Sequence, residues 1–437
     1  MSLIAFPPDF LWGAATAAHQ VEGQNFNNDW WDWEQTPGHI KKGYTSAIAN
    51  NWYAGRYVED FERARQLGIK AIRLSVEWSR VETGEGEWDG TALKYYRRML
   101  QVMKESGLTP QITLHHFTNP RWLAAEGGWE NPRTVQLFVR FVRRVVEELG
   151  YLCDFWVTLN EPNILATIGY LFGDFPPGKR NIGSVFPVLR HLLRAHAGAY
   201  YAIHDLQPNA RVGVAHHFRP FFPHNPDSPL DRLTASLRDR VFNQLFFDAI
   251  ETGRVGAPLG RNEYWPEVKG TQDFVGLNYY YTDHVTFNPS QANTFFGETV
   301  LDHYAQSLYE LFPTVGNIEL WGLEKVLGDL AKYGKPIYIT ENGVFDNGRN
   351  LQTHYLVTHL AALQRAIQAG ADVRGYFWWT LVDNFEWNEG YDARFGLYHL
   401  DLETQARTPK PVAEVYAQVI RDNGVSDALM DQYGRPD

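Results

Sequence analysis

The stretch KPIYITENGV, residues 335–344, joins a short apolar run to an abrupt polar end. Residues 337–340 have the β-branched and aromatic character of a buried strand, and Glu341 follows directly, before an Asn-Gly pair. A carboxylate buried without a partner is costly, whereas one at the edge of a polar site is not. The stretch therefore predicts a buried strand that ends in such a site.

Short apolar runs of the same kind recur along the chain and alternate with amphipathic stretches. Two of the latter, 54–68 and 131–150, are predicted helices, and the second opens on Asn131-Pro132 and closes on Gly150, as a capped helix does. Such alternation indicates parallel strands joined by crossover helices. The candidate strands are residues 10–16, 71–76, 109–116, 154–160, 211–217, 273–279, 336–340 and 375–380.

Eight such units predict an α/β fold, a closed (β/α)₈ TIM barrel. We expect residues 1–437 to form a single catalytic domain, with loop insertions at the C-terminal face of the barrel. The alternative is an open, doubly wound sheet. Against it, the first strand and its continuation, FLWGAATAAHQ (10–20), lack the glycine-rich turn that binds a dinucleotide.

Polar residues gather where these predicted strands end. Barrel enzymes carry their catalytic groups at the C-terminal ends of several strands, so this sorting indicates one shared site. The residues in question are His19 and Gln20 after the first strand, His115 and His116 at the third, Asn160 and Glu161 at the fourth, Asn278 to Tyr280 at the sixth, Glu341 at the seventh, and Trp379, Glu386 and Trp387 at the eighth.

Composition excludes several classes of partner. The formal net charge of −11 disfavours nucleic acid and anionic membrane surfaces, both of which attract basic proteins. The one cysteine, Cys153, permits neither an internal disulfide nor a multi-cysteine metal site. The N-terminus lacks the features of a secretory signal, and no apolar run has the length of a membrane span, so we expect a cytoplasmic enzyme.

Aromatic residues are abundant, with 15 Trp, 23 Tyr and 26 Phe. Most are expected to form the core, but many lie beside carboxylates and amides at strand ends, where they suit the C–H faces and hydroxyls of a sugar. Glu161 and Glu341, each at a strand end, are the two carboxyls that glycoside hydrolysis requires. A separation of about 5–5.5 Å would retain the anomeric configuration and a wider gap would invert it, and the sequence leaves both outcomes open.

Several motifs along the chain resemble those of glycoside hydrolase family 1, the β-glucosidase family of (β/α)₈ barrels. The resemblance covers essentially the whole chain, in the family's order. Its motifs are FPPDFLWGAATAAHQVEG (6–23), IRLSVEWSR (72–80), TLNEP (158–162), GLNYY (276–280), ITENG (339–343) and DNFEWNEGYDARFGL (383–397).

The resemblance implies that Glu161 is the general acid/base and Glu341 the nucleophile. It also implies that Arg73 and Tyr280 contact Glu341 and favour its charged form, while Glu161 starts protonated because the charge of Glu341 raises its pKa. The residues expected to bind substrate are Gln20, His116, Phe117, Asn160, Asn278, Trp379, Glu386, Trp387 and Phe395. Of the two neighbouring histidines, His116 rather than His115 is assigned to the site.

One position departs from the family pattern. In HHFTNP (115–120), Phe117 replaces the tryptophan that most members carry, and with it an indole N–H that usually meets the 3-hydroxyl of the sugar. Strict glucose preference is therefore in question, and fuco-, galacto- and manno-configured substrates stay open. Glu386 would repel a phosphate, and the nearby Arg394 is not the lysine of phospho-β-glycosidases, so a 6-phosphoglycoside is disfavoured.

The sequence thus predicts a retaining exo-β-glycosidase, foremost a β-glucosidase, which acts on a small β-glycoside or oligosaccharide without cofactor or metal. A transglycosylase is an open alternative. An inactive sugar-binding relative would lack one of the glutamates, and an aldolase or metal-dependent isomerase would need a strand-end lysine or a ligand cluster. The pair His216-His217 has no third ligand at useful spacing, so we interpret it as structural. Nothing in the sequence indicates the oligomeric state.

Overall fold

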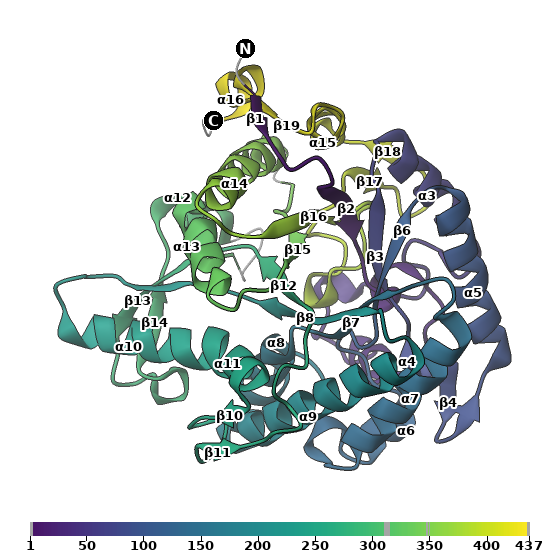
Figure 1. Ribbon diagram of the computed structural model, residues 1–437, viewed down its shortest axis with the longest axis horizontal. Coiled ribbons are helices and arrows are strands. Elements are labelled where there is room, and N and C mark those ends of the chain that lie inside the picture. Colours follow the sequence, from purple (N-terminus) through teal and green to yellow (C-terminus); the bar gives the residue numbers. More distant parts are fainter. Residues whose placement is uncertain (1–2, 310–314, 347, 349, 435–437) are drawn as a thin grey trace.

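The computed structural model describes residues 3–309, 315–346, 348 and 350–434. At its centre, eight parallel strands close into a barrel (Figure 1), which confirms the predicted (β/α)₈ fold and excludes the open sheet. The barrel strands are β2 (Leu11–Ala15), β3 (Ala71–Ser75), β6 (Thr109–Thr113), β7 (Phe155–Asn160), β8 (Arg211–His217), β12 (Phe274–Tyr279), β15 (Ile337–Asn342) and β16 (Val373–Trp379).

The first strand closes the barrel. On one side of β2, Ala14 pairs with Trp378 of β16, and on the other it pairs with Ile72 of β3. Strands buried on both faces are apolar almost throughout, which is why each predicted run reads as continuous rather than alternating. Every predicted strand therefore became a barrel strand.

A ring of helices surrounds the barrel, as expected for crossover connections (Figure 1). The predicted helix 131–150 begins three residues later, at Thr134, because the Asn131 side chain accepts the backbone N–H of Arg133 in a turn before it. The surrounding helices are α3 (Tyr57–Gln66), α5 (Gly90–Glu105), α7 (Thr134–Leu149), α9 (Ile182–Leu206), α11 (Leu245–Thr252), α13 (Leu320–Ala331), α14 (Leu351–Gln368) and α15 (Pro411–Asp422).

Two strand ends differ from the prediction in ways that shape the site. Strand β6 ends at Thr113, so His115 and His116 lie in the loop that follows it. Strand β15 continues through Asn342, which places Glu341 inside the strand, directly beside Asn278 of β12. Register shifts in both β12 and β15 near these residues accompany that extension. Such irregularities re-aim side chains at barrel rims.

Insertions follow the C-terminal ends of β8 and β12. They form a small sheet of β9 (Phe221–Pro223), β13 (Asp283–Phe287) and β14 (Gly297–Val300), packed against α10 (Pro229–Asp239). The helix α12 (His303–Tyr309) follows β14 in the insertion after β12. The short helices that follow other barrel strands are α1 (Ala18–Val21), α2 (Asp29–Glu34), α4 (Trp78–Val81), α6 (Arg121–Ala125) and α8 (Pro162–Thr167).

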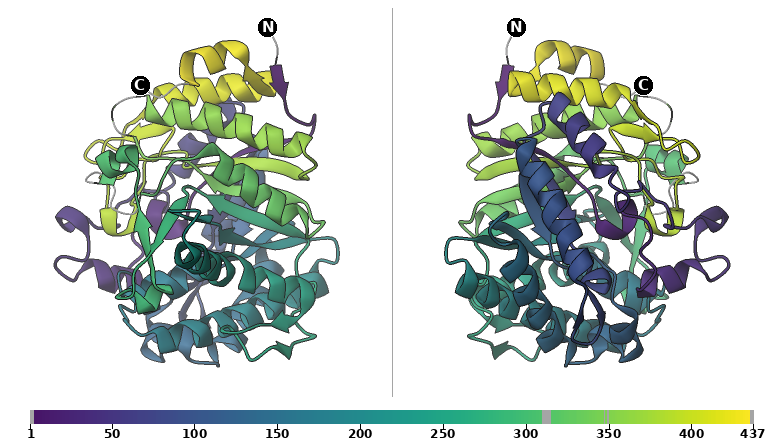
Figure 2. Two further views of the ribbon diagram at one scale, coloured as in Figure 1. Left: turned by 90° about the vertical axis from the view of Figure 1, so that its left-hand side faces the viewer. Right: turned by 90° about the vertical axis from the view of Figure 1, so that its right-hand side faces the viewer.

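The two ends of the described chain lie side by side (Figure 2). There β1 (Leu3–Ala5) pairs antiparallel with β19 (Gly424–Ser426), next to α16 (Asp427–Tyr433). Among the described helices, none combines the length and the apolar character that crossing a bilayer requires. The remaining strands are the hairpins β4 (Glu82–Gly84) with β5 (Glu87–Trp88), β10 (Arg254–Val255) with β11 (Glu263–Tyr264), and β17 (Tyr398–Leu400) with β18 (Arg407–Pro409).

Candidate active site

Glu341, near the end of β15, has a donor on each carboxyl oxygen. Nη1 of the fully buried Arg73, from β3, lies 2.5 Å from Oε1. The hydroxyl of Tyr280, which follows β12, donates to Oε2 at 2.7 Å, and Phe395 packs edge-on against the Tyr280 ring. A cation and a phenol donor both stabilise an ionised carboxylate. The structure thus brings together the carboxylate and the two partners that the sequence suggested.

Glu161 follows β7 in a left-handed backbone conformation, with φ 44° and ψ 59°. Its N–H donates to the Ala215 carbonyl oxygen of β8, which anchors the turn, and Pro162 then starts α8. Two side chains reach the same carboxyl oxygen: Asn278 Nδ2 at 2.9 Å and His217 Nδ1 at 3.0 Å from Oε1. A non-glycine residue in this conformation is strained, and such strain concentrates at functional sites.

A chain of hydrogen bonds connects the two glutamates. Asn160 Oδ1 accepts from Arg73 Nη2 at 2.6 Å and from Asn278 Nδ2 at 3.1 Å. Its amide nitrogen therefore must donate, and it lies 3.1 Å from His116 Nε2. His116 accepts that bond, so its ring is neutral with the proton on Nδ1. Burial, with help from the nearby Arg73 charge, holds the pKa of His116 well below its usual range, as this tautomer requires.

A third carboxyl, Glu386, lies at the other side of the site. Its Oε2 accepts from Gln20 Nε2 at 3.2 Å and from Trp379 Nε1 at 3.3 Å. Gln20 Oε1 and His116 Nδ1 are buried and have no hydrogen-bond partner within the described part of the chain. Buried polar atoms are normally paired, so an acceptor and a donor that both lack a partner indicate a site for a hydroxyl-bearing ligand.

Aromatic rings border these polar groups. Trp387 stacks on His116 with ring centroids 5.9 Å apart, and Phe117 meets Trp387 edge-on at 5.2 Å. Trp379 stacks against His116 from 6.0 Å. Phe117 is buried and has a φ of 71°, so its ring is held among neighbours on a constrained backbone. With these rings, every residue predicted for the site belongs to one connected constellation.

The protonation order of the two central glutamates reverses our expectation. Burial raises the pKa of Glu341 to about 7, although Arg73 opposes this rise. Burial also raises the pKa of Glu161, but the charge and hydrogen bond of His217, with the Asn278 donor, outweigh it and leave that pKa below the ordinary value. The sequence analysis interpreted His217 as structural, whereas its Nδ1 lies 3.0 Å from Glu161 Oε1.

The raised carboxyl pKa values predict that stability falls with rising pH. Burial raises the pKa of Glu386 to about 8, and Glu341 and Glu161 add to the rise. Between its ordinary value of 4.5 and about 8, Glu386 binds more protons in the folded than in the unfolded chain, so its contribution to stability is lost as pH rises through that window. We expect Tm to fall from pH 5 to pH 8.5. The matching loss of unfolding free energy should be smaller by on the order of 1 kcal/mol in Glu386→Gln, which keeps an acceptor for Trp379 but no titrating group. Parallel Tm–pH curves for the two proteins would contradict this prediction.

His115 lies outside the constellation although it is adjacent to His116. Its Nε2 is 3.1 Å from Asn119 Oδ1 and 3.2 Å from Trp129 Nε1, behind the loop. Burial lowers its pKa to about 4, so it is a neutral packing residue. The structure therefore places His116, and not His115, against Asn160.

His217 is the site residue that the sequence analysis did not identify. It was interpreted with His216 as structural, and that holds only for His216, whose Nε2 lies 3.0 Å from the Phe242 carbonyl oxygen. His217 instead contacts Glu161. Its place at the C-terminal end of the fifth barrel strand was a usable signal, because other barrel strands deliver a site residue from the same position.

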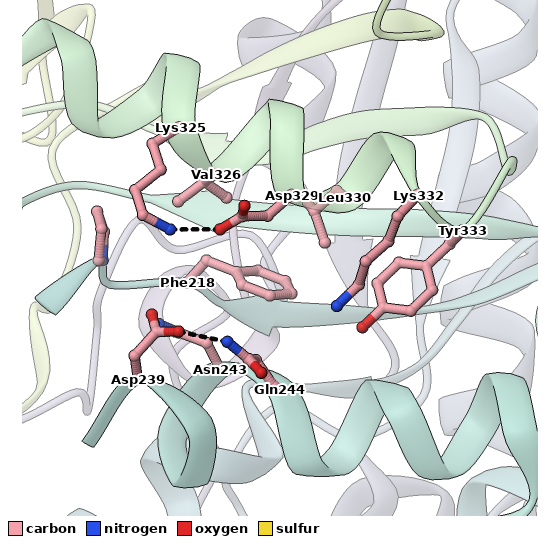
Figure 3. A pocket seen from close by; sticks show the side chains of 11 residues that line it. Phe218, Asp239, Asn243, Gln244, Lys325, Val326, Asp329, Leu330, Lys332 and Tyr333 are labelled. Atoms are coloured by element: carbon pink, nitrogen blue, oxygen red, sulfur yellow. Dashed lines mark hydrogen bonds and ion pairs between the residues drawn. The ribbon is translucent and has the colours of Figure 1, made fainter. Parts of the chain in front are cut away.

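Figure 3 shows a pocket beside α13 in which Lys325 pairs with Asp329, and Asn243 donates to Asp239. These groups satisfy one another. None of the residues that line the pocket is among those predicted for the site. Within the described residues, no three His, Cys, Asp or Glu side chains come together as metal ligands would.

Comparison with known proteins places this geometry in a family. The model of glycosyl hydrolase family 1 matches residues 3–425. The chain belongs to glycosyl hydrolase family 1. It is 34% identical to β-glucosidase A of Thermotoga maritima over 98% of this chain and 100% of that protein, and 31% identical to a β-galactosidase of Pyrococcus woesei over 98% and 99%.

A solved structure agrees with this assignment. The β-glucosidase of Thermotoga maritima in complex with glucoimidazole has a TM-score of 0.88 to this chain and 33% identity, and the match covers 97% of this chain and 100% of that one. This family 1 chain is therefore a retaining β-glycosidase built on a (β/α)₈ barrel. Its relatives differ in the sugar that their names specify, so membership alone does not fix the sugar that this enzyme cleaves.

Proposed function

We propose that this family 1 enzyme is an exo-acting β-glucosidase that removes terminal non-reducing β-D-glucosyl residues and also accepts β-fucosyl and β-galactosyl residues. We further propose that residues 1–437 act as a single catalytic domain. The observation that carries the proposal is the buried hydrogen-bonded chain that runs from Glu341 through Arg73, Asn160 and Asn278 to Glu161. That the enzyme is cytoplasmic stays a prediction from the sequence.

The two glutamates share one proton, and the enzyme reacts in the state in which that proton lies on Glu161 and Glu341 is ionised. In the first step, Glu341 acts as the nucleophile. A carboxylate oxygen of Glu341 forms a bond to the anomeric carbon while the glycosidic C–O bond breaks, and Glu161 gives its proton to the departing oxygen. Arg73 and Tyr280 hold the Glu341 carboxylate in place, so little rotational freedom is lost on the way to the transition state.

In the second step, Glu161 acts as the base. Once Glu341 is an ester its negative charge is gone, and Glu161 is ionised after its proton transfer. Glu161 takes a proton from water, the water oxygen bonds to the anomeric carbon, and the ester bond to Glu341 breaks. Two inversions restore the β-configuration, and both carboxyls return to their initial states.

We assign recognition of the sugar to the polar side chains around these glutamates that have hydrogen-bonding capacity to spare. Gln20 Oε1 can accept from a hydroxyl and His116 Nδ1 can donate to one, while Glu386 can accept from two neighbouring hydroxyls. Asn160 lies between Arg73 and His116, where it can meet the 2-hydroxyl, and Trp379 offers an aromatic face to the ring.

Phe117 is the reason to propose a broad rather than a strict sugar preference. Its ring lies against His116, Trp387 and Phe175 and offers no hydrogen-bond donor. A sugar hydroxyl near Phe117 therefore forms no hydrogen bond with it in either orientation, and Phe117 distinguishes little between sugars that differ at that hydroxyl. Sites that pair a hydroxyl with a buried polar group discriminate far more strongly than sites that only pack against it.

Initial rates on a set of aryl β-glycosides test this proposal. We expect kcat/KM for the glucoside, fucoside and galactoside to lie within about 100-fold of one another, because apolar contacts discriminate by about that factor. The 6-phospho-β-glucoside should be at least about 10³-fold worse, since its phosphate would be buried without a cation to pair with, the Arg73 guanidinium being already engaged by Thr113, Glu341 and Asn160. Proton NMR of the first product should show the β-anomer. Preferential cleavage of the phosphorylated substrate, or a first product of α-configuration, would contradict the proposal.

A further inference from the structure

His217 meets the proposed acid/base from a barrel strand that contributes no other residue to the site. Its ring lies at the end of β8, largely buried, with the Tyr280 ring stacked on one side at 5.8 Å and Phe242 edge-on at 5.9 Å. Its carbonyl oxygen accepts from Asn163 Nδ2 at 2.8 Å, which fixes the backbone from which the ring projects. The imidazole is thus held on several sides with Nδ1 toward Glu161.

Both side-chain hydrogen bonds to Glu161 described above reach the same carboxyl oxygen, Oε1. His217 Nδ1 and Asn278 Nδ2 both reach Oε1, at 3.0 Å and 2.9 Å. Asn278 cannot be reversed, because the same amide nitrogen also donates to Asn160 Oδ1 and its own Oδ1 accepts from Thr340. Oε1 is therefore an acceptor of two hydrogen bonds. A carboxylic acid in this position carries its proton on the other oxygen, Oε2.

We propose that His217 is a positioning residue for Glu161, which donates from Nδ1 to Oε1 and thereby keeps the exchanged proton on Oε2. This inference rests on the proposed role of Glu161 as acid/base. The acid step then always delivers the proton from Oε2, and the base step returns a proton to the same atom. Asn278 alone supplies one neutral donor, whereas His217 adds a second donor that can be charged.

Removal of His217 is expected to change the pKa of Glu161. Its donor and charge stabilise ionised Glu161 and lower that pKa, as do Asn278 and Arg73, whereas burial raises it. Loss of the imidazole should therefore make the last proton of the glutamate pair harder to remove. The titratable groups facing the His217–Glu161 pair are His216 on β8, Tyr280 after β12, Arg73 on β3, Glu341 on β15 and, farther off, Glu386.

Two substitutions separate the donor from the charge. In His217→Asn, the side-chain amide nitrogen can occupy the place of Nδ1, which keeps a neutral donor on Oε1. In His217→Phe, the ring still stacks on Tyr280 but the donor is lost. We expect the alkaline limb of the kcat/KM–pH profile for a phenyl β-glucoside to move up by about one pH unit in His217→Phe and by less in His217→Asn.

Two controls distinguish this role from a structural one. A 2,4-dinitrophenyl β-glucoside needs little protonation of its leaving group, so both variants should cleave it with kcat/KM within about threefold of the wild type. His204→Asn removes a half-buried histidine that lies 3.0 Å from Asp273 at the opposite end of the barrel, and it should leave both pH limbs unchanged.

Each outcome decides the proposal. An upward shift ordered wild type, His217→Asn, His217→Phe supports it. An unchanged alkaline limb in two active variants would overturn it, and so would equal losses on both substrates. If His217→Phe does not fold, the His217→Asn shift alone decides. A wild type without glycosidase activity would reject the proposed function and this role with it, whereas an active wild type with unshifted variants rejects only the role of His217.

Discussion

Replacement of Glu341 by glycine is expected to lower kcat/KM for aryl β-glucosides by at least about 10⁴-fold. The substitution removes the atom that would bond to the anomeric carbon, and no other carboxylate is shown with Arg73 and Tyr280 as paired donors among the described residues. Folding should survive, since the buried Arg73 guanidinium keeps its hydrogen bonds to Thr113, the Thr340 carbonyl oxygen and Asn160 after the carboxylate is lost. Rates on p-nitrophenyl β-glucoside, with Tm as the check on folding, measure the effect.

Azide provides the second part of this test. In Glu341→Gly, azide can enter from the vacated side, bond to the anomeric carbon and displace the aryl group, which yields an α-glycosyl azide rather than the β-configured sugar. Glu267→Gly, at an exposed position, is the matched control and should keep wild-type rates. A Glu341→Gly protein that hydrolyses the glucoside with retention and without added azide would remove Glu341 from the mechanism.

Replacement of Glu161 by alanine should produce a loss that depends on the leaving group. For a phenyl or alkyl β-glucoside, whose oxygen must be protonated as it departs, kcat/KM should fall by about 10²–10⁴-fold. For the 2,4-dinitrophenyl glucoside it should change by no more than about 10-fold, because that leaving group departs as an anion. The difference arises because Glu341 and its partners are untouched, so the first bond still forms.

The products of Glu161→Ala identify its second role. Without a base the glycosyl-enzyme accumulates, and kcat for the dinitrophenyl glucoside should drop although kcat/KM does not. Added azide should restore kcat and give a β-glycosyl azide, opposite in configuration to the product of Glu341→Gly. Equal losses on both aryl glucosides, or no recovery with azide, would show that Glu161 does not serve as the acid/base.

Much of this fold could be predicted because each barrel strand is apolar along its length. A strand buried on both faces needs that composition wherever it lies, so a local pattern such as PIYIT was enough to predict a buried barrel strand. The ends of the strands were harder to predict. Strand β15 runs two residues past the apolar run, because pairing with β12 next to a register shift extends it to Asn342. Pairing of this kind depends on a neighbour that is distant in sequence.

The site residues were predictable for a similar reason, with one exception. Asn160, Glu161 and Glu341 each lie at or next to a strand end, and a barrel gathers strand ends at one mouth whatever separates them in sequence. Arg73 lies in the middle of β3 and was expected from the family resemblance alone. His217 lies at such an end too, which pointed to the pair His216-His217, but the sequence did not show which of the two rings faces the site. Alternate residues of a strand face opposite sides, and only the closed barrel showed which of the two faces Glu161.

The sequence by itself determined the barrel, the pair of strand-end glutamates and the polar residues at the other strand ends, because these follow from composition and position along each strand. Arg73 and Phe395 were expected from the family resemblance alone. Only the tertiary structure decided which hydrogen bonds these residues make and which oxygen they reach. Protonation depends on those contacts over a few ångströms: burial raises the pKa of Glu341 to about 7, while His217, Asn278 and Arg73 together outweigh burial and lower the pKa of Glu161. Those contacts come from β3, β8 and β12, and no single stretch of the chain contains them.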